Sequence, residues 1–229
     1  MIPDPVIIGP HKLYLGDAYQ IRPTLGWFDV DVLDPPYEFD SSGGGAWRKA
    51  RGASDQIGAE GLDKGFDHSI INPLQCGSCV VFCHPNQFLD LLGYLKGSFH
   101  RQVLCHWIKD NPAPHRNKNY LADIEDYFHC WNRGYEPVGE HHDMHRHVSA
   151  PVGRSKEFGH PTVKPDRVMD KIMRNVQATT VCDSFMGTGS AGVAAIKAGK
   201  IFTGIEHNPV HFATAIARIR AAFSMKDAA

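Results

Sequence analysis

The tetrapeptide Asp34-Pro35-Pro36-Tyr37 is the segment of this sequence best suited to do chemistry. The Asp34 carboxylate and the Pro35 carbonyl are hydrogen-bond acceptors, and Tyr37 adds a flat aromatic face. Two successive prolines hold these groups on a stiff, extended backbone. Two acceptors beside an aromatic plane match a primary amine on a planar ring. The alternative interpretation is a proline-rich turn that only ends a strand.

A glycine-rich loop is the second segment that predicts a site. It follows an apolar run that ends at Asp183, and Gly187, Gly189 and Gly192 have the spacing Gly-x-Gly-x-x-Gly. Such glycines let the backbone approach a ligand closely, and the following helix presents its free N–H groups. The next apolar run ends at Glu206, about 20 residues on, where a carboxylate can bind two ribose hydroxyls. The loop therefore predicts a nucleoside-cofactor site, with a simple strand-to-helix turn as the alternative.

Two shorter segments add weaker signals. His160-Pro161-Thr162-Val163-Lys164-Pro165 stands directly before an amphipathic helix, which Thr162 could also simply cap. Leu13 to Ala18 is a short strand pattern that ends in Gly16-Asp17. An acidic side chain there could accept a hydrogen bond from the exocyclic amine of a cofactor base, and equally could belong to an ordinary turn.

The elements that must position these segments alternate between β-rich runs and helical stretches, which is typical of an α/β sheet. We predict strands near residues 12–16, 27–33, 79–83, 102–108, 126–132, 179–183 and 201–206. Helices are predicted over 165–176 and 190–197 and from 209 onward, with apolar residues on one face. Residues 38–67 and 139–160 resist assignment, and connections of this length are usually functional loops.

The composition is that of an ordinary globular protein. The 229 residues are 42% hydrophobic and 21% charged, which suits one domain over 1–229. No apolar run approaches the ~20 residues that span a bilayer, and the first residues do not resemble a signal peptide. We therefore expect a cytoplasmic protein without a membrane partner.

Metal binding is not expected. Cys76, Cys79 and Cys83 have partly ligand-like spacing, but they lie in or beside an apolar run and are better explained as buried free cysteines. The cluster from His141 to His147 is interpreted as a polar loop whose role stays open. The formal net charge of −1 does not indicate a nucleic-acid binder, so a binding face needs local cations.

Together, the four segments resemble the DNA amino-methyltransferases that modify adenine N6 or cytosine N4. More narrowly, they look like the permuted subgroup in which Asp-Pro-Pro-Tyr precedes the cofactor loop, and the order of elements agrees from Leu13 to about Ile219. The resemblance implies a Rossmann-like S-adenosylmethionine-dependent methyltransferase fold. That fold has a seven-stranded, mostly parallel sheet with one antiparallel strand near an edge and helices on both faces.

The resemblance also implies roles for individual residues. The catalytic residues would be Asp34, Pro35, Pro36 and Tyr37. S-adenosyl-L-methionine would be bound by Asp17, Ala18, Asp183, Phe185, Met186, Gly187, Gly189, Ser190, Glu206, Thr162 and Lys164. Local positive charge, and not the resemblance, indicates the cations that could face DNA, which are Arg48, Lys49, Arg51, Lys109, Arg116 and Lys118. Trp107-Ile108-Lys109 matches a further family element without an assigned role, and Ser184 and Met186 depart from the usual residues of the cofactor loop.

The predicted activity is methyl transfer to the N6 amine of an adenine that is flipped out of DNA. A cytosine-N4 methyltransferase would use the same machinery, although that subgroup more often has Ser in place of Asp34. A methyltransferase for RNA or a glutamine side chain fits the order of segments less well. A non-catalytic DNA-binding relative is the alternative from another class. DNA is the expected partner, and a homodimer is plausible because the family often dimerises.

Overall fold

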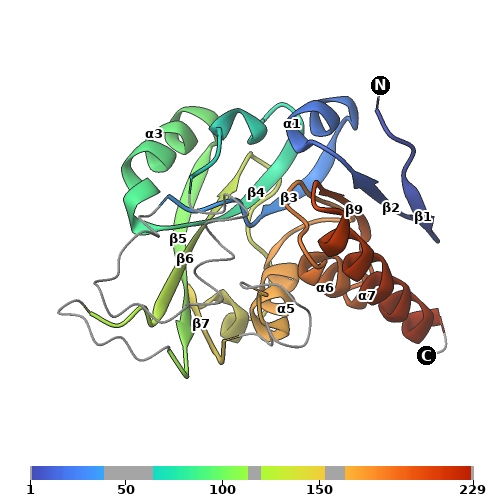
Figure 1. Cartoon of the computed structure of the whole chain (residues 1–229). Coiled ribbons are helices and arrows are strands. Elements are labelled where there is room, and N and C mark those ends of the chain that lie inside the picture. Colours follow the sequence, from blue (N-terminus) through green and yellow to red (C-terminus); the bar gives the residue numbers. More distant parts are fainter. Residues whose placement is uncertain (1, 39–63, 113–119, 153–162, 228–229) are drawn as a thin grey trace, which may run out of the picture.

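A computed structural model describes residues 2–38, 64–112, 120–152 and 163–227, and its centre is a twisted sheet with helices on both faces (Figure 1). Within this part of the chain the sheet has nine strands in the order β1-β2-β9-β8-β3-β4-β6-β5-β7. The strands are β1 (Val6–Ile8), β2 (His11–Leu15), β3 (Phe28–Leu33), β4 (Cys76–Cys83), β5 (Arg101–Lys109), β6 (Ile124–Trp131), β7 (His147–Ala150), β8 (Thr180–Asp183) and β9 (Ile201–Glu206). The α-helices are α1 (Ala18–Ile21), α3 (Phe88–Ser98), α5 (Asp166–Asn175), α6 (Ser190–Lys197) and α7 (Pro209–Asp227). Short 3-10 helices are η1 (Arg22–Thr24), η2 (His68–Ile70), η3 (Pro85–Gln87) and η4 (His141–Met144).

The sheet is mostly parallel, as the family resemblance implies. Only β6, antiparallel to β4 and β5, and β1, antiparallel to β2, run against the other described strands. The strand count differs from the prediction, because nine described strands replace the expected seven. The two additional strands, β1 and β7, are the edges of the sheet. They have three and four residues, which is too short for a periodic pattern to be recognised.

One of these edge strands corrects the loop expected at 139–160. Residues 141–144 form η4, and β7 follows and pairs in parallel with β5 from His106↔His147 to Lys109↔Ala150. This pairing is tertiary, so the local residues, which are rich in His and polar groups, do not reveal it. The remaining parts of the two predicted loops, from 39 to 63 and from 153 to 160, lie outside the described residues.

Two apolar clusters, one on each face of the sheet, hold the helices. Helices α5, α6 and α7 pack on one face through residues such as Ile172, Ala194 and Ile219. On the other face α1 and α3 bury Ile21 and Leu91, among others. Burying such large aliphatic side chains stabilises the fold by roughly 1.5–3 kcal/mol each. Figure 1 shows the two helical layers above and below the strands.

The predicted helices form where the apolar periodicity places them. In α5 the residues Val168, Met169, Ile172 and Met173 are buried on one side. Helix α6 packs closely against its neighbours because Gly192 has no Cβ. A Cβ at that position would lie 2.7 Å from Phe202 Cε1 and 2.8 Å from Ile219 Cδ1, which is closer than real contacts allow.

A buried ion pair lies under α1 on the face that also carries α3. Arg22 donates to both carboxylate oxygens of Asp31 at 3.1–3.2 Å, to the Gly26 carbonyl at 2.9 Å and to the Gln75 carbonyl at 3.0 Å. Both side chains are almost inaccessible, with exposed fractions of 2% and 1%. The pair connects the segment after α1 to the middle of β3.

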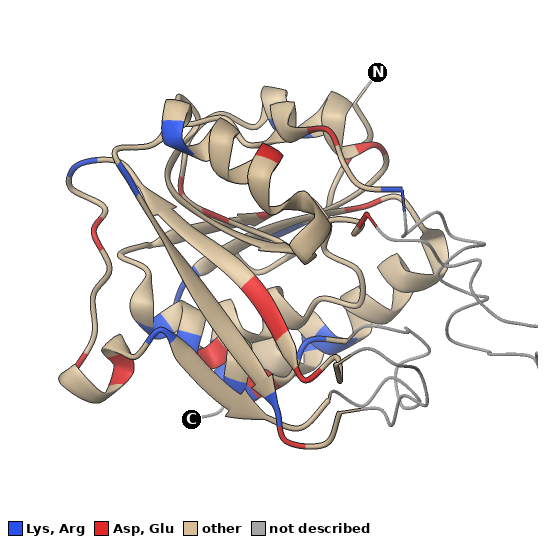
Figure 2. Cartoon of the chain, turned by 90° about the vertical axis from the view of Figure 1, so that its left-hand side faces the viewer, with Lys and Arg blue, Asp and Glu red and all other residues tan. Residues whose placement is uncertain are grey.

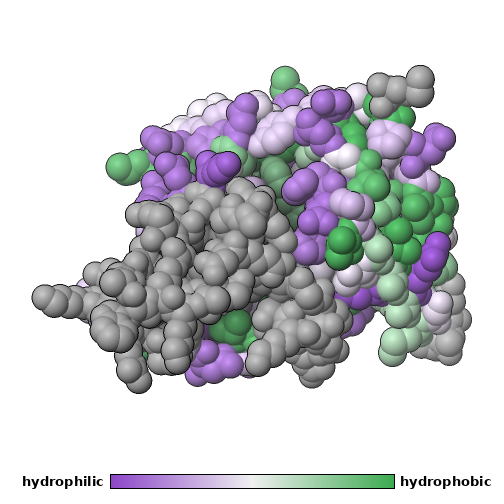
Figure 3. Space-filling view, in the orientation of Figure 1, coloured by the Kyte–Doolittle hydropathy of each residue, from purple (hydrophilic) through white to green (hydrophobic). Residues whose placement is uncertain are grey.

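The surface carries charges of both signs. Figure 2 shows Lys and Arg interspersed with Asp and Glu on the face formed by α3 and the outer strands. Figure 3 shows apolar residues gathered on the side where β1 and α7 lie, and Ile7, Val210 and Met225 are among the exposed ones. Among the helices that the structure describes, none combines the length and apolar character that crossing a membrane requires.

Candidate active site

Three carboxylates come together at the carboxyl ends of neighbouring parallel strands. Asp34 follows β3, Asp183 ends β8 and Glu206 ends β9, and these strands lie in the order β9-β8-β3. The carboxyl ends of such strands are where open α/β sheets bind ligands. A small cavity opens there, and its lining includes Asp34, Lys164, Asp183, Met186, Gly187 and Ser190. The fold thus brings the predicted catalytic segment and the predicted cofactor loop to one place.

The Asp34 carboxylate is held by a lysine from a distant part of the chain. Lys164 Nζ donates to both Asp34 oxygens at 2.6 Å, and the exposed fractions of the two side chains are 4% and 21%. Tyr37 Oη lies 3.2 Å from Asp34 Oδ1. Pro35 is buried and Pro36 is half-buried, so the backbone of the tetrapeptide is packed on its inner side. Burial and the negative charge of Glu125 raise the pKa of Asp34, and the Lys164 ammonium opposes that rise.

Glu125 belongs to the same cluster, and sequence reasoning missed it. It is the second residue of β6 and accepts hydrogen bonds from Tyr37 Oη and Lys164 Nζ, both at 2.8 Å, and from Lys109 Nζ at 3.0 Å. Burial alone would raise the pKa of Glu125, but the two ammonium groups outweigh burial and hold it at about 2. Glu125 lies opposite Trp107 of the Trp107-Ile108-Lys109 element in the β5–β6 ladder, a pairing that the sequence pattern does not reveal.

Lys164 is the most buried charge of the cluster. Its ammonium contacts two carboxylates and lies 4.7 Å from the centre of the Phe82 ring and 5.4 Å from that of Tyr37. Burial would lower its pKa, but Asp34 and Glu125 raise it, so Lys164 stays protonated. The resemblance placed Lys164 on the cofactor. The structure places its ammonium on Asp34, while the residue also lines the cavity next to Asp183.

The glycine loop has the backbone conformation that its sequence predicts. Gly187 and Gly189 have φ values of +53° and +85°, which favour glycine, and Gly189 is the residue before α6. Glu206 Oε2 accepts from Gly187 N at 2.8 Å, and Glu206 Oε1 accepts from Asn208 N at 2.6 Å. Asp183 Oδ1 accepts from Phe185 N at 2.9 Å. Both carboxylates therefore shape the loop before any ligand binds.

The electrostatics of this end of the sheet favour a cationic ligand. Asp183 is buried, and burial, together with the nearby Asp34, Glu206 and Asp31, raises its pKa well above the usual range. A positive charge beside Asp183 would offset this repulsion. A sulfonium or an ammonium group has the required charge.

Other residues that were predicted to bind the cofactor contact neighbouring parts of the protein. Asp17 caps α1 by accepting from Tyr19 N at 2.9 Å, and Ala18 is the buried first residue of that helix. Phe185 packs edge-on against Tyr19 and Phe66, with ring centroids 6.4 and 6.1 Å away. Ser190 begins α6, and its hydroxyl lies 3.3 Å from Arg218 Nη1.

Among the predicted DNA-facing cations, only Lys109 is described. Its side chain is 17% exposed, paired with Glu125, and 5.1 Å from the centre of the Trp107 ring. The other predicted cations lie outside the described residues, as does Thr162 of the predicted cofactor-binding residues. These cations are Arg48, Lys49, Arg51, Arg116 and Lys118. The three cysteines considered as metal ligands are free and buried in β4, as predicted.

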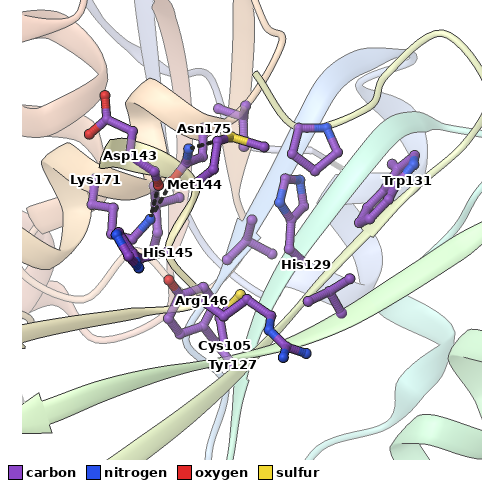
Figure 4. A pocket seen from close by; sticks show the side chains of 15 residues that line it. Cys105, Tyr127, His129, Trp131, Asp143, Met144, His145, Arg146, Lys171 and Asn175 are labelled. Atoms are coloured by element: carbon purple, nitrogen blue, oxygen red, sulfur yellow. Dashed lines mark hydrogen bonds between the residues drawn. The ribbon is translucent and has the colours of Figure 1, made fainter. Parts of the chain in front are cut away.

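A larger pocket lies elsewhere, between the outer strands and the layer formed by α5 and η4 (Figure 4). Its volume is about 310 Å³, and its aromatic walls include Tyr127, His129 and Trp131. Lys171 on its edge donates to the Asp143 carbonyl and to Asn175 Oδ1. No residue predicted for catalysis or cofactor binding lines this pocket.

The parallel sheet, the glycine loop between β8 and α6, and the acidic strand ends define the class of Rossmann-like methyltransferases. Residues 28–217 match the family model N6_N4_Mtase, described as DNA methylase, so the chain belongs to this family of N6/N4 DNA amino-methyltransferases. The family resemblance inferred from the sequence is thereby confirmed.

Individual relatives agree with the family. The type II methyltransferase M2.LlaDCHI of Lactococcus lactis subsp. cremoris is 27% identical over 118 residues, and the match covers 44% of this chain and 44% of that protein, less than half of either. The solved complex of M1.HpyAVI with SAM superposes with a TM-score of 0.65 at 23% identity, covering 90% of this chain and 98% of that one. The cytosine-N4-specific PvuII DNA methyltransferase superposes with a TM-score of 0.68 at 11% identity, covering 99% and 96%. At these identities both structures support the fold.

S-adenosylmethionine is the cofactor of this family, and the residues present fit it. The buried carboxylate of Asp183 suits the positive charge of the methionine part, and the positive φ at Gly187 and Gly189 lets the backbone turn tightly beside it. Glu206 stands at the end of β9, where a ribose is expected.

Proposed function

We propose that this protein transfers the methyl group of S-adenosylmethionine to the N6 amine of adenine in DNA. The observation that carries the proposal is the position of Asp34, which lines the same small cavity as Asp183, Gly187 and Ser190 and has a partly exposed side chain. An aspartate at this place, followed by Pro35, Pro36 and Tyr37, offers the acceptors that an exocyclic amine needs.

The chemical difficulty is that an aromatic amine is a poor nucleophile, because its lone pair is delocalised into the ring. The Asp34 carboxylate and the Pro35 carbonyl would accept the two amine hydrogens and favour a pyramidal nitrogen. When bound, S-adenosylmethionine would supply the electrophilic methyl group that this nitrogen attacks. The protein's contribution is alignment and fixed electrostatics, and the surplus proton leaves through Asp34 or to water.

Tyr37 would provide the surface against which the target base stacks. A base within a duplex cannot reach the cavity, so it must be flipped out. The Tyr37 hydroxyl donates to Glu125 at 2.8 Å, which fixes the orientation of the ring before a base arrives. Phosphate contacts by the cations predicted at 48–51 and 116–118 would make DNA binding depend on salt.

The deciding experiment identifies the product. The purified protein is incubated with labelled S-adenosylmethionine and unmethylated DNA, and the nucleosides released by digestion are separated by mass. N6-methyladenine is the expected product. If the product is N4-methylcytosine, the mechanism stands and the target base is cytosine instead of adenine. Absence of any labelled nucleoside, with cofactor binding intact, would favour a different substrate, and loss of cofactor binding as well would favour a non-catalytic DNA-binding relative.

Further properties of the proposed enzyme remain predictions. A homodimer and the assignment of residues 1–229 to one domain rest on the resemblance and the composition. Gel filtration with light scattering measures the first, and a cooperative single unfolding transition would support the second.

A further inference from the structure

Four charged side chains of alternating sign form a chain through the proposed active site. Lys109 pairs with Glu125 at 3.0 Å, Glu125 pairs with Lys164 at 2.8 Å, and Lys164 pairs with Asp34 at 2.6 Å. None of the four side chains is more than 21% exposed. The residues come from β5, from β6, from the segment before α5 and from the end of β3, so only the folded chain assembles them.

The position of Lys164 conflicts with the task assigned to Asp34. Its ammonium bridges both oxygens of the carboxylate that, together with the Pro35 carbonyl, has to accept the target amine. An amine that approaches those oxygens from the same side must displace the ammonium. A displaced and buried ammonium would be costly unless another carboxylate kept it paired.

Glu125 meets that requirement. It already accepts a hydrogen bond from Lys164, and Lys109 and Tyr37 hold its carboxylate in place. We propose that Glu125 is a positioning residue that retains Lys164 when the target amine takes over Asp34, and that Lys109 fixes Glu125 for this purpose. This inference rests on the proposed function, and it gives the Trp107-Ile108-Lys109 element a role.

The charge of Glu125 is the feature to test. In Glu125→Gln the amide fills the space of the carboxylate without its charge. Lys164 then has Asp34 as its one remaining carboxylate partner in this cluster, so its ammonium stays paired with Asp34. We expect the rate of methyl transfer to fall by about 10- to 100-fold, as for loss of a hydrogen bond between charged groups. In Glu125→Asp the charge remains, so a substantial part of the rate should return.

The pH profile separates this role from a merely structural one. The negative charge of Glu125 raises the pKa of Asp34. Removing that charge lowers the pKa, so the acid limb of kcat/KM in Glu125→Gln should move to lower pH. The limb of Glu125→Asp should stay near that of the wild type. Asp126→Asn is the matched control, because Asp126 follows Glu125 on β6 but pairs with His106, at 2.6 Å, outside the site.

The experiment measures pH profiles of methyl transfer to DNA, cofactor affinity and thermal unfolding for the wild type and these three variants. A lower rate and a shifted acid limb in Glu125→Gln, with cofactor affinity retained, support the role. A wild-type rate, an unshifted limb, or equal losses in Asp126→Asn and Glu125→Gln overturn it. If the wild type methylates no DNA base, the proposed function itself fails and this role fails with it; an active wild type with an unaffected Glu125→Gln rejects only the role.

Discussion

Two aspartates of the same chain segment are each paired with a buried cation: Asp31 lies within β3, and Asp34 follows β3 directly. The two ion pairs differ in whether the cation serves one carboxylate or two. Arg22 saturates Asp31 and uses its remaining donors on two carbonyl groups. Lys164 is shared between Asp34 and Glu125, and Asp34 lines the small cavity beside the glycine loop. The closed pair is suited to fix the fold. The shared pair leaves a carboxylate able to exchange partners.

The pKa values support this distinction. Burial raises the pKa of Asp31 to about 6, although Arg22 lowers it, so the cost of burial exceeds the gain from pairing. Such a pair adds little net stability, but removing one partner leaves the other as a buried charge without a counter-ion. At Asp34 burial also raises the pKa and Lys164 opposes the rise, but here a second carboxylate, Glu125, adds to it.

The largest expected effect is on catalysis, at Asp34. Replacing Asp34 by Ala removes the acceptor for the amine, and we expect turnover to fall by about 10³-fold or more, while cofactor binding is spared. The measurement is kcat/KM with labelled S-adenosylmethionine, with cofactor affinity from calorimetry. Unchanged turnover would remove Asp34 from the mechanism.

The next effect is on stability, at Arg22. In Arg22→Met the Asp31 carboxylate stays buried without a partner, and the free energy of unfolding should fall by about 3–5 kcal/mol. The rate per folded molecule should be unchanged. Urea unfolding gives the first quantity and a DNA methylation assay the second. The double variant Arg22→Met/Asp31→Leu should recover most of the stability, and a failure to recover would mean that the pair has another function.

A third buried titratable group, His129, has no hydrogen-bond partner for its Nε2 among the described residues. Burial, and then the nearby Lys171, lower its pKa to about 4, so the neutral form is preferred in the folded state. Between about pH 6.5 and 4 the unfolded chain binds more protons, and stability therefore falls as the pH falls through this window, by on the order of 3 kcal/mol. Urea unfolding between pH 7 and 4 should show a flatter profile for His129→Gln, and parallel profiles would exclude this contribution.

The smallest effect is expected at Lys109, at the outer end of the charge chain. Lys109→Met removes one of the two ammonium groups that hold Glu125, while Lys164 remains. Because Lys109 is partly exposed, the loss in methyl-transfer rate should be about fivefold at most. A loss as large as that of Asp34→Ala would place Lys109 on the substrate and not behind Glu125.

The comparison also shows which parts of the site a sequence can reveal. The sequence reveals Asp34, Gly187 and Glu206 because each lies at or soon after the end of a β-rich run. Parallel strands bring the carboxyl ends of these runs to one edge of the sheet. Glu125 is not recognisable in this way. The position of Glu125 in the site depends on the register in which β5 and β6 pair. It also depends on Lys164, which is 130 residues from Asp34 in the sequence and lies beside it in the folded chain.

Local apolar periodicity predicts the α/β class, and the short motifs identify the family, whose resemblance implies the mostly parallel sheet. The tertiary structure alone decided the edge strands β1 and β7, the burial of Asp31 with Arg22, and the sharing of Lys164 between Asp34 and Glu125. The physical reason is that strand register and ion pairing join groups far apart in the chain, and no local pattern records which charge will meet which.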